Sequence, residues 1–224
     1  FCRNHAFRVS YAYSKGRGNT TASGAPLSNF QLLNDLRLDL NEGPTDFDRP
    51  HNLVFSGSAL VPRTGGLMFS TVIRYVSGTA FTVQDSTLDS DRNGILFEPL
   101  PSGTYTGTGT NAVSVENNGG RNGARGPSFF QADARLGYRI KLGARKVELF
   151  GEVFNLTDRA NFANPAGDRF AATFLRTLTL RAGASPRTAQ FGARFEFYRH
   201  CVYPRRGPVR SVVGRRSGCR RVYR

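Results

Sequence analysis

Residues 146–162 read KVELFGEVFNLTDRANF, and the first half of this stretch alternates between two kinds of side chain. One row is aliphatic or glycine and holds Val147, Leu149, Gly151 and Val153. The other row is charged and holds Lys146, Glu148 and Glu152, with Phe150 and Phe154 among them. A period of two predicts a β-strand with one dry and one wet face. The two phenylalanines indicate that the charged face is packed against something, or that they lie near a rim.

The same alternation appears on both sides of this stretch. Within 129–141 the apolar row is Phe130, Ala132, Ala134, Leu136, Tyr138 and Ile140, and the polar row includes Gln131, Asp133, Arg135 and Arg139. Within 188–197 the apolar row is Phe191, Ala193, Phe195 and Phe197, and the polar row includes Gln190, Gly192, Arg194 and Glu196. In a soluble sandwich the apolar rows would face a protein core, whereas in a membrane barrel they would face lipid and the charged rows a lumen. Periodicity alone leaves both alternatives open.

The order of strands and connections favours the barrel. We expect antiparallel strands over residues 5–14, 52–61, 67–77, 129–141, 146–155 and 188–197. Their connections alternate between long and short, so all long loops share one end of the sheet and all tight turns the other. Outer-membrane barrels have this asymmetry, with short periplasmic turns and long outer loops. Ten residues tilted by about 40° span roughly 25 Å, the height of their apolar band.

The first long connection contains LLNDLRLDLN at residues 32–41, which suits either a strand extension or a short helical turn. No apolar run approaches the ~18 residues of a spanning helix, so a membrane role must come from strands. The chain has 18 Phe and 8 Tyr but no Trp, which suits aromatic girdles as well as any β-rich core. These features indicate an all-β chain.

Charge and cysteine are concentrated at the C-terminus. The net charge is +15, but residues 198–224 contain nine arginines and no acidic residue, so the body is only mildly basic. The three cysteines are Cys2, Cys201 and Cys219, which leaves residues 3–200 without a disulfide or a thiolate metal site. The chain begins at Phe1 rather than methionine, and the first strand starts almost at once. We therefore expect a fragment that lacks its natural N-terminus.

Several segments resemble one known family. These are VSYAYSK (9–15), PTDFDRPHNLVFSG (44–57), YVSGTAFTV (75–83), RNGARGPSFFQADARLGY (121–138), ELFGEVFNLTDRANF (148–162) and the closing QFGARFEF. In this order they resemble the TonB-dependent outer-membrane receptors, in particular the Oar-like group with a carboxypeptidase-regulatory-like domain before the plug. The resemblance covers about residues 7–197.

The resemblance implies a barrel of about 22 strands with a plugged lumen, which takes up a scarce nutrient with energy relayed by TonB. This chain would supply the last six or so strands, as residues 1–197, in the outer membrane of a Gram-negative bacterium. The plug and the TonB box, which lie N-terminal in the family, would lie outside it. The implied partners are membrane lipid, the TonB complex through the missing N-terminal region, the barrel assembly machinery and a small-molecule, glycan or peptide ligand. No cofactor is implied.

The closing segment is similar to the outer-membrane insertion signal of the family, on Gln190, Gly192, Phe195 and Phe197. In the family the chain stops at that last aromatic residue, but here residues 198–224 follow. This tail could bind nucleic acid or anionic lipid. Since it lacks a fold-forming pattern, we expect a disordered extension from a read-through or frameshift, with no nucleic-acid partner.

A calcium loop is the one metal-site candidate. Asp89, Asp91, Asn93 and Gly94 fit its opening, but the bidentate carboxylate should fall at Leu100, and Glu98 is two positions early. We therefore favour an ordinary Asp/Asn/Gly turn in an outer loop, and no metal. The three histidines, His5, His51 and His200, are scattered, which also argues against a metal site.

The charged rows are candidates for the lumen lining: Arg74, Asp133, Arg135, Arg139, Glu148, Glu152, Arg194 and Glu196. They could line a translocation path, but their mixed sign favours salt-bridge ladders between strands and to a plug. No Ser/His/Asp or Cys/His arrangement supports catalysis, so we expect no enzyme. Two alternatives remain to be separated from the receptor. One is a small structural or adhesive outer-membrane barrel, and the other is a soluble β protein that binds acidic partners through its tail.

Overall fold

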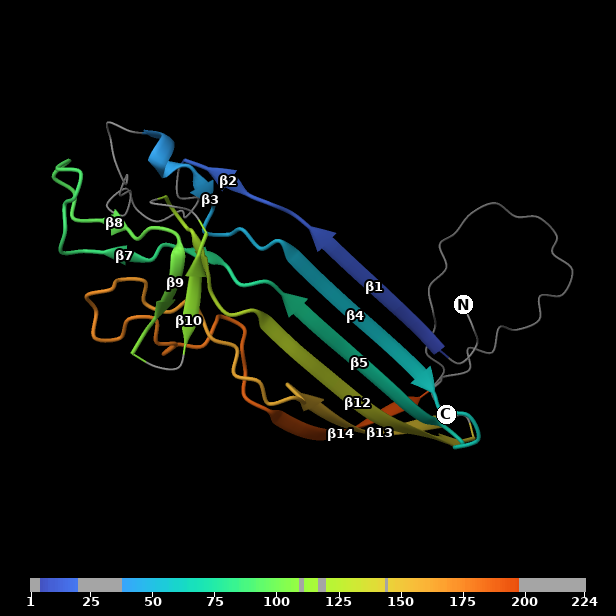
Figure 1. The fold of residues 1–224 in the computed structure, drawn as a ribbon. Helices are drawn as coiled ribbons and strands as arrows, with labels where there is room; N and C mark the ends of the chain where they lie inside the picture. The colour runs from blue at the N-terminus through green and yellow to red at the C-terminus, as the bar shows by residue number, and fades with distance from the viewer. Residues whose placement is uncertain (1–4, 20–37, 109–110, 117–119, 144, 198–224) are drawn as a thin grey trace, which may run out of the picture.

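The computed structural model describes residues 5–19, 38–108, 111–116, 120–143 and 145–197. Its largest element is one antiparallel six-stranded sheet in which each strand pairs with the next along the chain (Figure 1). The strands are β1 (His5–Tyr13), β4 (His51–Leu60), β5 (Leu67–Val76), β12 (Phe129–Leu142), β13 (Arg145–Phe154) and β14 (Thr188–Phe197). All six predicted strands are confirmed, and their ends differ by at most one residue.

The register places the alternating rows on opposite faces of the sheet. Leu136 of β12 lies opposite Gly151 of β13, which lies opposite Phe191 of β14. These residues belong to the apolar face, where Leu136 is 51 %, Leu149 50 % and Phe191 89 % exposed. The other, charged face includes Glu148, which is only 4 % exposed. The sheet is therefore inside-out relative to a soluble sandwich, whose core would cover the apolar face.

Most aromatic side chains of the apolar face lie towards the two ends of the strands, whereas Phe55 and Phe191 lie nearer the middle. Tyr11, Tyr13, Tyr75 and Phe130 lie towards the long connections, and Phe69, Tyr138, Phe195 and Phe197 towards the tight turns. Such pairs of aromatic belts mark the two interfaces of membrane barrels. Among the described residues, no helix has the length and hydropathy of a membrane span.

The tight turns connect β4 to β5 and β12 to β13, at one end of the sheet (Figure 1). Gly143 follows β12 with a φ of 62°, in the left-handed region that glycine enters without strain. The long connections all emerge at the other end, as the sequence predicts. Their described parts, residues 14–19, 38–50, 77–108, 111–116, 120–128 and 155–187, are called the loop layer below.

The loop layer contains one helical turn and short strands, and the alternation in the sequence predicts none of these short strands. These elements are β2 (Arg17–Gly18), the 3-10 helix Leu38–Asn41, β3 (Gly43–Pro44), β6 (Ala80–Phe81), β7 (Gln84–Asp85), β8 (Glu98–Pro99), β9 (Gly103–Thr106), β10 (Ala112–Val115) and β11 (Ala124–Arg125). Four of its two-stranded pairs are β2–β3, β6–β11, β7–β8 and β9–β10. The helix confirms the helical alternative for the end of residues 32–41; residues 32–37 lie outside the described residues.

The buried hydrophobic cluster of the described residues lies in the loop layer rather than under the sheet. It consists of Phe81, Val83, Leu100, Val115, Ala124, Phe174 and Leu175, with Tyr105 and Val113 packed against it. These residues come from the second and third long connections, and members from different connections are at least 50 positions apart in sequence. The long connections are therefore a packed layer with a core of its own at one end of the sheet.

Candidate functional site

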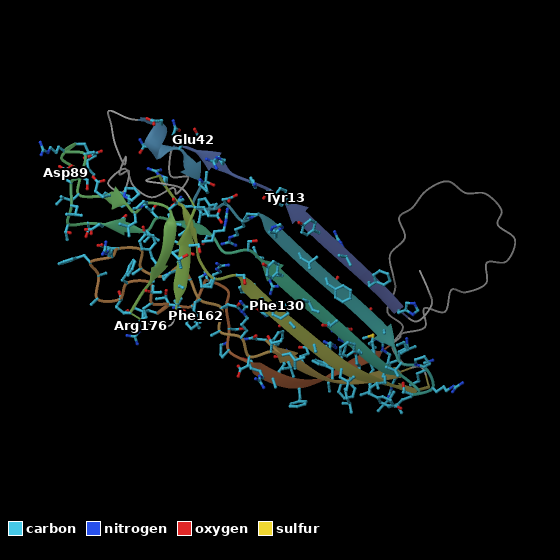
Figure 2. The ribbon with its side chains drawn as sticks, viewed as in Figure 1. Tyr13, Glu42, Asp89, Phe130, Phe162 and Arg176 are labelled. Atoms are coloured by element: carbon cyan, nitrogen blue, oxygen red, sulfur yellow. The ribbon has the colours of Figure 1, made fainter. Side chains whose placement is uncertain are left out.

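The charged face of β12, β13 and β14 carries a ladder of ion pairs, formed by Arg135, Arg139, Glu148, Glu152 and Arg194. Arg135 bridges two carboxylates of β13, with Nη2 2.9 Å from Glu148 and Nη1 2.5 Å from Glu152. Glu148 is also approached by Arg139 of β12 at 3.7 Å and by Arg194 of β14 at 4.0 Å. The ladder therefore ties three neighbouring strands together on their charged face. Figure 2 shows the side chains along the sheet, with Tyr13 and Phe130 labelled at the ends of β1 and β12 that lead to the loop layer.

Burial of Glu148 depends on a glycine of the neighbouring strand. A Cβ atom on Gly137 would lie 3.1 Å from Oε1 of Glu148, so the missing side chain leaves room for this carboxylate. Oε2 of Glu148 is buried without a hydrogen bond and faces only the two more distant arginines. Burying an ionised carboxylate is costly unless positive charge or hydrogen bonds compensate for the lost hydration. The three arginines meet that need, which suits a structural ladder.

Phe150 lies on the charged face between two glycines. It pairs with Gly137 of β12 and Gly192 of β14. A Cβ atom on Gly192 would lie 2.5 Å from Cζ of Phe150, so the ring occupies the space above this glycine. The guanidinium of Arg135 lies 3.9 Å from the ring centre. Phe150 is therefore accommodated by neighbours on the same face of the sheet, two glycines and Arg135.

The remaining predicted lumen residues, Arg74, Asp133 and Glu196, lie on the same face. Asp133 accepts hydrogen bonds from the Gln131 side chain at 2.8 Å and from the backbone of Asn155 at 2.9 Å, which fixes the start of the third long connection. Arg74 pairs with Gln131 in the register, and Glu196 pairs with Lys146. The eight predicted charges thus share a face, and five of them form one connected cluster.

The four residues of the predicted insertion signal divide between the two faces of β14. Gln190 donates a hydrogen bond to Glu152, and Gly192 lies beneath Phe150, both on the charged face. Phe195 and Phe197 lie on the apolar face, 61 % and 70 % exposed. Two members therefore have packing roles inside the sheet, and the two aromatic residues remain at its surface. The tail at 198–224 and His200 lie outside the described residues.

Buried polar side chains join the three long connections, and no local pattern in the sequence predicts these contacts. Asp48, with a side chain 3 % exposed, accepts a hydrogen bond from the Gly16 backbone at 2.8 Å and pairs with Arg125. Asn122 donates to the Pro44 carbonyl at 2.8 Å and to Asp46 at 2.7 Å. These contacts join the first connection to the second. They involve residues about 77 positions apart, which no local pattern predicts.

The second and third connections are joined in the same way. Thr79 donates to Asn164 at 2.8 Å, and Ser86 donates to Asp168 at 2.6 Å. Asn111 donates to the Leu175 carbonyl at 3.1 Å, beside the buried cluster. Side chains and core together therefore hold the three long connections in one layer.

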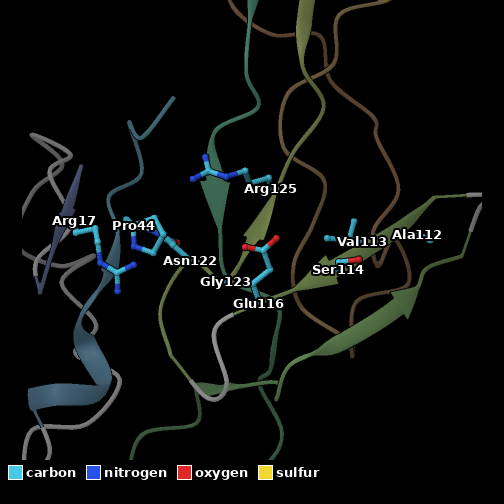
Figure 3. Close-up of a pocket in the computed structure, with 9 residues that line it drawn as sticks. All are labelled: Arg17, Pro44, Ala112, Val113, Ser114, Glu116, Asn122, Gly123 and Arg125. Atoms are coloured by element: carbon cyan, nitrogen blue, oxygen red, sulfur yellow. Dashed lines mark hydrogen bonds between the residues drawn. The ribbon is translucent and has the colours of Figure 1, made fainter. Parts of the chain in front are cut away.

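A polar pocket of about 440 Å³ lies in the loop layer (Figure 3). Its lining comes from the first and second connections: Arg17, Pro44, Ala112, Val113, Ser114, Glu116, Asn122, Gly123 and Arg125. Arg17 lies 3.9 Å from Glu42, and both side chains are more than half exposed. The pocket therefore presents guanidinium, carboxylate and hydroxyl groups over a small apolar patch. Its size is within the ~300–1,000 Å³ of small-ligand sites.

The calcium-loop candidate is a hydrogen-bonded turn that includes Glu98. Asp89 accepts from the backbone of Asn93 and Gly94, both at 3.0 Å, and Asn93 accepts from Ile95 at 2.7 Å. Oxygens of Asp89, Asp91 and Glu98 lie within 4.8 Å of one another. Partial burial, and then the charges of Asp91 and Asp89, raise the pKa of Glu98. The turn brings the Glu98 carboxylate close to those of Asp89 and Asp91, although Glu98 comes two positions before the ligand position of a calcium loop. The Asn93 side-chain oxygen accepts a backbone hydrogen bond within the turn.

Comparison with known proteins identifies the family. No match was found among curated proteins, and none among solved structures. A family model described as "Outer membrane beta barrel domain" matches residues 1–190, most of the chain. This agrees with the inside-out sheet, the aromatic belts and the separation of long and short connections. The chain therefore belongs to the outer-membrane β-barrel domain family, and its place is the outer membrane of a Gram-negative bacterium.

Proposed function

We propose that this chain is the C-terminal barrel part of a TonB-dependent receptor of the Oar-like group, which imports a scarce nutrient. The observation that carries the proposal is the loop layer, a packed layer with a polar pocket above an inside-out sheet. A barrel that only anchors or stiffens the membrane has no need of such a layer. A receptor needs one, because its ligand must first be held outside the lumen.

The shape of the sheet supports a larger barrel. Within the described residues, β1 and β14 each have one neighbour and do not pair with each other. Transmembrane barrels must be closed, and the smallest have eight strands. Six strands fit as a segment of a larger wall. The charged ladder would then face the lumen, as the walls of plugged barrels do.

The proposed ligand is a small molecule, glycan or peptide, held in part by the pocket between Arg17 and Arg125. The pocket's mixed charge favours a polar solute with both donor and acceptor groups. The proposed energy source is the TonB complex, engaged through a region N-terminal to this chain. The barrel assembly machinery would insert the strands, with Phe195 and Phe197 of β14 as surface contacts. The function is transport rather than catalysis.

A capture experiment tests the proposal. The natural product of this gene is extracted from its own outer membrane in mild detergent and passed over an immobilised periplasmic domain of the host's TonB. We expect retention alongside known TonB-dependent receptors of the same extract, which serve as internal controls. If those controls are retained while this protein flows through, the receptor proposal is wrong and the structural or adhesive barrel gains support.

A further inference from the structure

The apolar face carries a groove of about 550 Å³ across β12, β13 and β14. We call it the β12–β14 groove and define it by Leu136, Tyr138, Leu149, Gly151, Phe191 and Ala193. Gly151 and Ala193 form its shallow floor because they carry no side chain or only a methyl group. Phe191 forms a wall: a Cβ atom on Gly151 would lie 3.1 Å from its ring. The groove opens on the side of the sheet opposite the ion-pair ladder.

The lining of the groove is hydrocarbon, apart from the Tyr138 hydroxyl group. Leu136 and Leu149 are half exposed and Phe191 is almost fully exposed. On a sheet whose apolar face meets lipid, a trough of this kind is filled by an acyl chain. A shallow groove holds that chain better than a flat wall does, because the chain gains dispersion contacts with the Phe191 ring as well as with the floor.

A basic residue lies on the same strand as Leu149, beyond the groove and four positions towards the tight turns. Arg145 belongs to the same outward row of β13 as Leu149 and Gly151 and is exposed. Its guanidinium carbon lies 5.9 Å from the centre of the Phe197 ring, which is also on the apolar face. Arg145 is six residues from Gly151, or ~20 Å along the strand and ~15 Å along the membrane normal after tilt. That distance is about half of a bilayer's hydrocarbon core, the depth of one acyl chain.

The orientation of the sheet selects the leaflet. Tight turns of outer-membrane barrels lie on the periplasmic side, so Arg145 is at the level of the inner leaflet's headgroups. A guanidinium there binds phosphate through charge-assisted hydrogen bonds. From this placement we infer that the β12–β14 groove holds one acyl chain of an anionic phospholipid of the inner leaflet, with the headgroup phosphate on Arg145. This site depends on membrane insertion and is independent of TonB.

The test compares an anionic with a neutral lipid on the intact protein. Protein from the native outer membrane is exchanged into detergent with equal amounts of phosphatidylglycerol and phosphatidylcholine of identical chains. Retained lipid is then counted by mass spectrometry. We expect phosphatidylglycerol to be enriched over phosphatidylcholine, and R145Q to lower that enrichment about five-fold, which corresponds to ~1 kcal/mol per basic group near an anionic headgroup.

The matched control is K141Q, which removes the same charge from the same hairpin. Lys141 pairs with Lys146 and belongs to the charged row of β12, on the other face of the sheet. We expect less than a two-fold change for it. Equal retention of the two lipids by the unmodified protein, or equal effects of R145Q and K141Q, would mean that only non-specific annular lipid binds and would overturn the inference.

Two further variants test the groove itself. A193L and G151L each place a larger side chain on its floor, from β14 and from β13. Both should reduce retained phosphatidylglycerol several-fold although Arg145 is intact. A193L does not alter a glycine, so it remains informative if G151L fails to accumulate. Unchanged retention in a folded A193L protein would exclude the groove as the acyl-chain site.

Discussion

The guanidinium carbon of Arg135 lies 3.9 Å from the centre of the Phe150 ring while the same group binds Glu148 and Glu152. One side chain thus covers an aromatic ring and holds two carboxylates on the lumen-type face of β13. A planar guanidinium can do both, whereas a lysine ammonium cannot bridge two carboxylates in the same way. Arg135 is therefore the centre of the ladder.

Replacing Arg135 should destabilise the sheet. R135M leaves Glu148 buried, with only the two more distant arginines near it. We expect a loss of about 2–3 kcal/mol in the free energy of unfolding, less than for a buried pair that loses its sole partner. Urea titration of the protein in detergent micelles, followed by heat-modifiable gel mobility, measures this. R8M, on the same face of β1 and exposed, is the charge-matched control and should have little effect. Equal effects would show that the ladder contributes nothing of its own.

Gly192 can be tested for two roles, which are to make room for the Phe150 ring and to be recognised by the barrel assembly machinery. G192A forces a Cβ atom against Phe150 and should cost about 1–3 kcal/mol by overpacking. Replacing the Phe150 ring with the smaller leucine side chain makes room for this Cβ atom. The double variant G192A/F150L should therefore regain most of the free energy of unfolding that G192A loses, which a double-mutant cycle measures. If Gly192 is needed instead for recognition by the assembly machinery, the double variant would remain as defective in membrane insertion as G192A alone.

The loop layer should depend on Asp48 far more than on Glu42, although both carboxylates lie in the first long connection. Asp48 is buried and holds Arg125 and the Gly16 backbone, whereas Glu42 makes an exposed contact of 3.9 Å with Arg17. D48A should lower the local stability by about 1–3 kcal/mol, seen as faster hydrogen exchange in residues 77–81 and 124–128. E42A should change it by less than about 0.5 kcal/mol. Equal exchange in both variants would contradict the packed layer.

The turn at residues 89–98 should become more protected as the pH falls. The pKa of Glu98 is raised in the folded protein, so the folded state binds more protons than the unfolded state between its ordinary value of 4.5 and the raised value. Stability therefore rises as the pH falls from neutral towards 4.5. E98Q keeps an oxygen that accepts the hydrogen bond of the Ser90 backbone, but it removes the charge repulsion from Asp91 and Asp89. This variant should therefore slow hydrogen exchange of residues 89–98 at pH 7 and abolish the pH dependence of their protection. Hydrogen-exchange rates are first corrected for their intrinsic pH dependence. If the corrected rates of the unmodified protein and of E98Q were identical at all pH values, this prediction would be wrong.

Calcium should leave the same turn unchanged. Asp89 already accepts two backbone hydrogen bonds, and the ligand expected at position 100 is a leucine. We expect equal exchange of residues 89–98 with calcium chloride and with a chelator. Protection by calcium that the chelator reverses would contradict the absence of a metal site here.

The sequence predicted the sheet well because alternation is a local signal. The strand at 188–197 was predicted with both ends correct, and the shared face of Arg135, Glu148 and Glu152 follows directly from a period of two. The loop layer could not be predicted in this way. Phe174 and Leu175 meet Phe81 and Val115 only in three dimensions, and no spacing in the sequence marks them as a core.

The candidate sites divide along the same line. Charged residues on strands were assigned to one face correctly, but the buried pair of Asp48 and Arg125 comes from positions 77 apart in sequence. The spacing of Glu98 does not fit a calcium loop, so the sequence does not group it with Asp89 and Asp91. In the structure, the β7–β8 pairing brings its carboxylate close to theirs. Local patterns determine faces, whereas long-range packing determines which polar groups meet.

The central claim is that the apolar face meets hydrocarbon, and spin-label accessibility tests it most directly. Single cysteines at Leu136, Leu149 and Phe191, and at Arg8 and Arg194 for comparison, are labelled with nitroxides in a background without native cysteine. The account predicts that labels in the first group, in membranes, collide with oxygen but not with a water-soluble nickel chelate, and that those at Arg8 and Arg194 show the opposite preference. Nickel access at Leu136, Leu149 and Phe191, with oxygen access at Arg8 and Arg194, would contradict it.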